Sequence, residues 1–101
     1  MLAYFDDVET AMRVLVIEGD PNIVETVRVC LELRWPDAVI VCAGSGREGI
    51  TITELQRPNI IILGNSLPDI NSLEAVRQIR LNSRVPIVVL TGCGREGQDR
   101  L

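Results

Sequence analysis

The sequence predicts an α/β fold in which helices cover an open, parallel β-sheet. The first observation is the apolar run at 60–63, whose residues do not alternate with polar ones, as in a strand buried on both faces. The second is that similar runs alternate with segments of helical periodicity, which is typical of βαβ units. The third is the length of 101 residues with 47% apolar content, which suits one small domain with its own core.

The first strand is predicted at 13–17, with Val-Leu-Val-Ile at its centre. Asp20 followed by Pro21 predicts the start of a helix, because aspartate is a good N-cap and proline is tolerated at the first helical position. This helix is expected to run to about residue 34, before Trp-Pro-Asp. Its apolar face is predicted to consist of Ile23, Val27, Cys30 and Leu31.

The middle of the chain is predicted to repeat this strand–helix pattern. A second strand at 38–43 leads into a glycine-rich turn at 44–49, and a helix follows to about residue 57. The third strand, 60–63, ends at Gly64. Because ligands bind beyond the carboxyl ends of strands in open parallel sheets, the position of Gly64 is the first candidate for a functional site.

The last helix and strand follow a turn. Asn71 and Glu74 resemble a capping box at the start of a helix that ends near residue 82. The fourth strand is predicted at 85–91, with Pro86 at its start, where a missing N–H is tolerated. The side chains that this helix is expected to turn inward are Leu73, Val76 and Ile79.

Residues 1–11 differ in composition from the rest, with two aromatic and three acidic residues. We predict that they form an N-terminal extension ahead of a domain at 12–101. Two interpretations of the extension stay open: a frayed tail ahead of a natural start at Met12, or a short amphipathic helix. The apolar positions of that helix would be Leu2, Phe5, Val8 and Met12.

The overall composition narrows the possible partners. The net charge of −4 argues against nucleic acid, because binding to phosphates requires a basic face. No apolar run approaches the roughly 20 residues of a membrane-spanning helix, so we expect no membrane partner. The start of the chain lacks the basic residues of a signal peptide. We therefore expect a cytoplasmic protein in which Cys30 and Cys42 are buried, reduced thiols.

Three segments together resemble the receiver domain of two-component response regulators. They are Arg-Val-Leu-Val-Ile-Glu-Gly-Asp-Pro at 13–21, a strand with its leucine–proline turn at 57–69, and Val-Pro-Ile-Val-Val-Leu-Thr at 85–91. The resemblance implies a flavodoxin-like fold with strand order 2-1-3-4, truncated here after the fourth strand. It also implies a role in a phosphorelay.

In that family, two acids after strand one bind Mg²⁺, and an aspartate after strand three accepts a phosphoryl group. Here Glu18 matches the first acid, Gly19 matches the second, and Gly64 stands at the phosphoacceptor position. Thr91 matches a switch hydroxyl that contacts the phosphate, whereas the family's lysine is missing because the chain has none. Asp20 falls one position after the acid pair, where its N-cap role explains it.

These departures remove the phosphotransfer chemistry, because that chemistry requires a carboxylate nucleophile. We expect no catalysis, no cofactor and no metal site beyond weak binding at Glu18, since one carboxylate is a poor Mg²⁺ site. Asp69 lies in the turn after the third strand and is expected to be a solvated turn acid.

A second pattern competes with the resemblance. Residues 44–49 and 92–97 both have the G-x-G-x-x-G spacing of dinucleotide-binding loops. That fingerprint also requires an acid near the end of the next strand, where this chain has Gly64 and Asn65. Nucleotide binding is therefore the third alternative for the function. The other interpretation of the two segments is that they are turns whose glycines relieve strain.

We expect a pseudo-receiver that acts through protein contacts without being phosphorylated. The alternative is a decayed or truncated remnant of a response regulator. The strand at 85–90 is apolar, and no fifth strand or final helix is expected beside it. We therefore expect its edge and the uncovered sheet face to bind a protein partner or a second copy.

Overall fold

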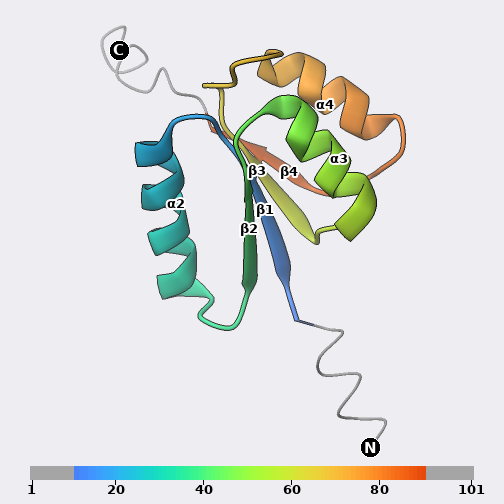
Figure 1. Ribbon diagram of the computed structural model, residues 1–101. Coiled ribbons are helices and arrows are strands. Elements are labelled where there is room, and N and C mark those ends of the chain that lie inside the picture. Colours follow the sequence, from blue (N-terminus) through green and yellow to red (C-terminus); the bar gives the residue numbers. More distant parts are fainter. Residues whose placement is uncertain (1–10, 91–101) are drawn as a thin grey trace, which may run out of the picture.

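The structure, a computed structural model, describes residues 11–90 and contains a four-stranded parallel sheet (Figure 1). The order β2-β1-β3-β4 confirms the predicted α/β fold and strand order 2-1-3-4. Residues 1–10 of the predicted N-terminal extension and Thr91 lie outside the described residues. The elements are β1 (Arg13–Ile17), α2 (Pro21–Arg34), β2 (Val39–Ala43), α3 (Gly46–Gln56), β3 (Ile60–Leu63), α4 (Ser72–Arg80) and β4 (Ile87–Val89).

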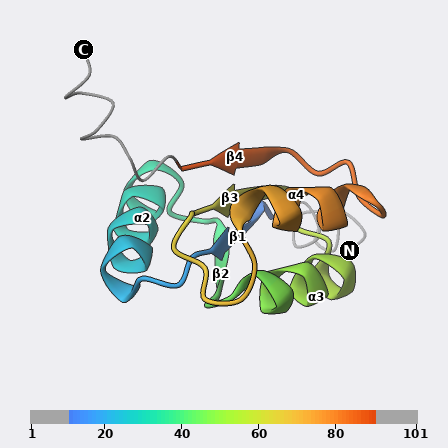
Figure 2. The same ribbon diagram turned by 90° about the horizontal axis from the view of Figure 1, so that it is seen from above.

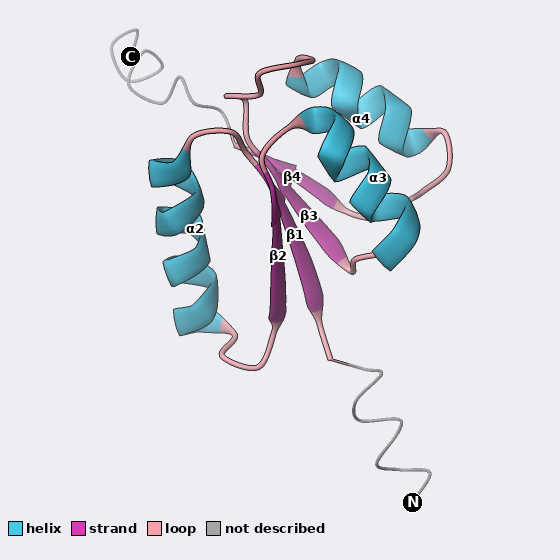
Figure 3. Cartoon of the chain, viewed as in Figure 1, coloured by secondary structure: helices cyan, strands magenta, loops and turns pink. Residues whose placement is uncertain are grey.

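Helix α2 covers one face of the sheet, and helices α3 and α4 cover the other (Figures 2 and 3). Alternate side chains of β1 point to the two faces, as a strand requires. Leu15 and Ile17 pack in the core on the side of α3 and α4, and Val14 and Val16 pack in a smaller core with Leu31 of α2. The central strands are therefore buried on both faces, as the apolar runs predicted.

Each described helix begins at a side-chain cap. Asp20 accepts a hydrogen bond from the N–H of Asn22 at 2.9 Å, and Asn71 accepts one from Glu74 at 2.8 Å, which confirms both predicted helix starts. Ser45 caps α3, so this helix begins at Gly46, inside the segment predicted to be a turn. None of the helices within residues 11–90 has the length and apolarity that crossing a membrane would require.

Two predictions about burial are wrong. Cys30 and Cys42 are free thiols as expected, but both residues are exposed. Cys42 lies on the edge strand β2, where partial desolvation still raises the pKa of its thiol. Leu73 is 71% exposed, because Ala75 and Ile79 occupy the buried stripe of α4.

Candidate functional site

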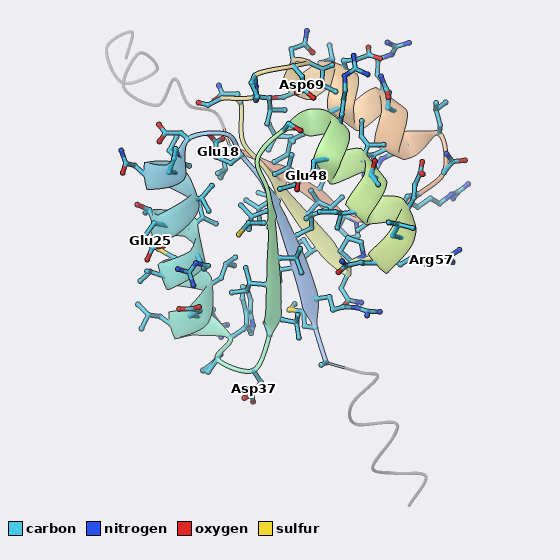
Figure 4. All side chains as sticks on the ribbon, viewed as in Figure 1. Glu18, Glu25, Asp37, Glu48, Arg57 and Asp69 are labelled. Carbon is cyan, nitrogen blue, oxygen red and sulfur yellow. The ribbon has the colours of Figure 1, made fainter. Side chains whose placement is uncertain are left out.

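The candidate site lies where β1 and β3 end side by side at the carboxyl edge of the sheet. Ile17 pairs with Leu63 in the parallel register, and the N–H of Gly64 donates to the carbonyl of Ile17 at 2.8 Å. Glu18 follows β1 at this edge, which Figure 4 shows beside the N-terminus of α2. This edge is where open parallel sheets bind ligands.

The Glu18 carboxylate fills the space of a side chain at position 64. Glu18 is only 2% exposed, although it is an acid at the edge of a sheet. A Cβ atom added to Gly64 would overlap Oε1 of Glu18 and would lie 2.6 Å from its Cδ. The position predicted to be a vacated phosphoacceptor is therefore already occupied, by a carboxylate from the neighbouring strand.

Backbone N–H groups hold this carboxylate. The N–H of Asp20 donates to Oε2 of Glu18 at 2.8 Å, and the N–H of Ser66 approaches Oε1 at 3.5 Å. Among the ion pairs of residues 11–90, none involves Glu18. A buried acid needs hydrogen bonds to offset its lost hydration, and here these come from the backbone on either side of the site.

Gly19, at the second acid position, is equally enclosed. Its N–H donates to the carbonyl of Ser66 at 3.0 Å. A Cβ at Gly19 would overlap that carbonyl oxygen and lie 3.2 Å from Cδ of Pro68. No described glycine has a positive φ, so Gly19 and Gly64 are required by space rather than by backbone conformation. The β3–α4 loop can therefore lie directly on the end of β1.

The far end of the same loop is fixed to helix α3 by Asp69. Its carboxylate accepts hydrogen bonds at 2.9 Å from the N–H groups of Gly46, Arg47 and Ile70. The bond from Arg47 is the main cause that holds the pKa of Asp69 below its usual value. Asp69 is exposed in the turn, as predicted, but its carboxylate also bonds the first N–H groups of α3, which lack helical partners.

This contact also accounts for the first G-x-G-x-x-G segment. Its helix N-terminus, where a nucleotide phosphate would bind, already holds the Asp69 carboxylate. A Cβ at Gly46 would lie 2.8 Å from Cδ1 of Ile70, and one at Gly49 would lie 2.7 Å from Cγ1 of Ile17. The glycines thus allow close packing, with no nucleotide needed to explain them. The second segment, 92–97, lies outside the described residues.

The structure thus brings three of the predicted positions together, namely Glu18, Gly19 and Gly64. The carboxylate of Asp20 instead points to α2 as its N-cap. Within residues 11–90, no group of three or more histidine, cysteine, aspartate or glutamate residues could hold a metal ion. No sequence pattern indicated Ser66, whose backbone contacts both Glu18 and Gly19.

Known proteins resemble this chain in sequence and in fold. Residues 14–99 match the family described as "Response regulator receiver domain". The DNA-binding response regulator MtrA of Mycolicibacterium smegmatis is 33% identical over 79 residues, which make up 78% of this chain and 34% of that protein. The transcriptional regulatory protein AfsQ1 of Streptomyces coelicolor is 35% identical over 79 residues, which make up 76% of this chain and 33% of that protein. This chain spans about a third of the length of these relatives.

Solved structures show the same fold. The chemotaxis response regulator CheY4 of Vibrio cholerae superposes with a TM-score of 0.71 at 22% identity, over 90% of this chain and 79% of that one. A receiver domain protein from Clostridium thermocellum gives 0.70 at 19% identity, over 88% and 73% of the two chains. With the family match over most of the sequence and a sheet of the same order, this chain belongs to the response regulator receiver domain family.

Proposed function

We propose that this receiver domain is a pseudo-receiver, which accepts no phosphoryl group and acts in two-component signalling by binding other proteins. The observation that carries the proposal is the Glu18 carboxylate, which occupies the volume of a side chain at Gly64. An aspartyl nucleophile is missing at that position, and the space in which it would react is filled.

Glu18 is a poor substitute for the missing nucleophile. A carboxylate attacks phosphorus only if one of its oxygens can reach the donor in line, and Glu18 is 2% exposed. Glycine at position 19 also leaves a single acid from the pair that would hold Mg²⁺, which needs several hard oxygen ligands. Both requirements for acyl phosphate formation are therefore unmet.

The contacts of the β3–α4 loop favour one fixed conformation. The loop is bonded to Gly19 at one end and to α3 through Asp69 at the other. A phosphodonor can shift a conformational equilibrium only if it interacts differently with the two states. We therefore expect the binding surface of this domain to be the same with and without a phosphodonor.

The first prediction tests this proposal. Incubation of the full chain with acetyl phosphate and Mg²⁺ should add no phosphoryl group, because Gly64 provides no nucleophile and Glu18 is enclosed. Intact-mass spectrometry is the measurement, and a receiver domain with its acceptor aspartate, treated in the same way, shows that the donor is active.

The Glu18→Gln variant makes the result specific. A hydroxylamine-sensitive adduct on the natural chain would contradict the proposal. If the adduct disappeared in Glu18→Gln, the acceptor would be Glu18 itself. If it persisted, the acceptor would lie elsewhere in the chain.

A second part of the proposal concerns the outer edge of β4. The carbonyl of Pro86 accepts from Ile61 at 2.9 Å, and the N–H of Leu90 donates to Leu63 at 2.7 Å. The polar groups of residues 86 and 90 therefore point toward β3. Since neighbouring residues of a strand point their backbone groups to opposite sides, those of Ile87 and Val89 point away from β3. Within residues 11–90, no strand lies on that side of β4.

We infer that this edge pairs with the same edge of a second copy. The two rows of backbone groups would satisfy each other across a two-fold axis, and the side chains of Val88 and Val89, each residue 45% exposed, would be covered. A partner protein could present a strand in the same way.

Light scattering over a concentration series should therefore show a mass that rises above that of one chain. Val88→Lys should weaken the association at least about tenfold, because a charge at a sheet edge opposes pairing. Leu33→Lys on α2 is the matched control, since it adds the same charge at an exposed apolar residue away from the edge. A constant single-chain mass, or equal effects of the two variants, would contradict pairing through β4.

A further inference from the structure

A pocket of about 350 Å³ lies at the end of the domain opposite to the acid site. It opens between the C-terminal ends of α3 and α4, which run side by side and end on the same side of the molecule (Figures 1 and 2). The pocket is separate from both the Glu18–Gly64 site and the outer edge of β4.

Buried residues form the floor of the pocket, and some of its polar groups already have hydrogen-bond partners. Thr53 is 4% exposed and Ile79 is 3% exposed. The Thr53 hydroxyl donates its proton to the carbonyl of Gly49 at 2.8 Å. Ser83 accepts a hydrogen bond from the N–H of Val85 at 3.1 Å, so its own hydroxyl proton is still available for a ligand.

Two arginines line the walls. Arg57 ends α3 and Arg84 lies in the turn before β4, and Figure 4 labels Arg57 at the end of its helix. Neither takes part in an ion pair of the described residues, in contrast to Arg28, Arg47 and Arg77. Glu54 is the one acid in the lining, so the pocket carries net positive charge in a chain whose net charge is −4.

The backbone of Arg57 gives an independent indication. It has φ 50° and ψ 66°, and it is the one residue other than glycine with a positive φ within residues 11–90. Glycine is the usual residue at such a helix end, because a Cβ is disfavoured in this conformation. Strained positions of this kind gather at ligand sites. The presence of arginine in this conformation therefore points to a role of its positive charge in binding a ligand.

The two helix ends themselves disfavour an anion, because their carbonyl groups carry partial negative charge. Part of this charge is already compensated, since the carbonyls of Gln78 and Ile79 accept hydrogen bonds from the N–H groups of Leu81 and Asn82. Charge-assisted hydrogen bonds from two guanidinium groups are stronger than the remaining dipole effect.

We propose that the pocket binds a small molecule through a carboxylate or phosphate group placed between Arg57 and Arg84. The planar donor fork of each guanidinium group matches the oxygens of either anion. The hydroxyl of Ser83 supplies a third donor, and Ile79 provides an apolar floor.

The test is a titration of the full chain, followed by the NMR signals of its backbone amides. Inorganic phosphate and succinate are the two probes, each at fixed ionic strength set with sodium chloride. Saturable shifts should appear at Thr53, Ser83 and Arg84, and the tighter probe shows which of the two anions the site prefers.

Arg84→Gln and Arg57→Gly should each weaken binding by roughly tenfold or more, the loss of one charge-assisted hydrogen bond. Arg57→Gly retains the backbone conformation, so this variant should fold. Arg34→Gln, at the end of α2, removes the same charge outside the pocket and should bind normally. The proposal would be overturned if neither probe gave saturable shifts, or if all three variants lost affinity equally.

Discussion

Replacing Gly19 by alanine should lower the free energy of unfolding by about 2–4 kcal/mol. A Cβ at this position would overlap the backbone carbonyl of Ser66, which a side-chain rotation cannot move. The β3–α4 loop would have to lift, and the hydrogen bond from the N–H of Gly19 to Ser66 would be lost with it. For a domain of this size, the thermal midpoint should fall by roughly 10–25 °C.

Gly44→Ala is the matched control for this experiment. Gly44 follows β2 at the same edge of the sheet, but the nearest atom to an added Cβ is Oε1 of Glu48, at 4.0 Å. Since its φ is not positive, alanine should change stability by less than about 1 kcal/mol. Thermal and denaturant unfolding of both variants decide the matter. Equal losses would mean that the loop does not rest on Gly19.

Much of the fold could be predicted because its signals are local. The strands at 13–17 and 60–63 are continuous apolar runs, as buried parallel strands require, and the structure confirms both ranges. The caps at Asp20 and Asn71 act on N–H groups two and three residues away. A pattern within one short window is sufficient to identify such features.

Burial was harder to predict, because it depends on which elements lie above a residue. Cys30 and Cys42 belong to apolar segments, yet both are exposed. Cys30 lies on α2, which no other described helix covers, and Cys42 lies on the edge strand β2. The spacing of apolar residues predicts which face of a helix or strand turns inward, but not how far other elements cover that face.

The site illustrates the same limit. The resemblance identified the positions of Glu18, Gly19 and Gly64. It indicated which acids are missing there, but not which contacts fill the space. The contacts that close it join residues far apart in the sequence, such as Ser66 with Gly19 and Asp69 with Gly46. No local pattern relates such pairs, so the sequence does not predict that Asp69, an exposed turn acid, also fixes the loop to α3.

The second large effect is expected at Gly64. Alanine at this position should force the Glu18 carboxylate away from the N–H of Asp20, at a cost of about 2–3 kcal/mol. Glu18→Ala removes the obstacle, so Gly64→Ala should cost far less when both substitutions are present. Glu18→Gln keeps the shape of the side chain without its charge, and Gly64→Ala should remain costly beside it. This control separates steric overlap from electrostatics.

The measurement that tests the central claim most directly is the coupling free energy between positions 18 and 64. Denaturant unfolding of the natural chain, Glu18→Ala, Gly64→Ala and the double variant gives this value. We expect the two alanine substitutions to be coupled by about 1–3 kcal/mol, with the double variant more stable than the sum of the single losses predicts. Losses that add within about 0.5 kcal/mol would contradict the account. In that case the carboxylate of Glu18 would not lie over Gly64, and the acceptor position would be open.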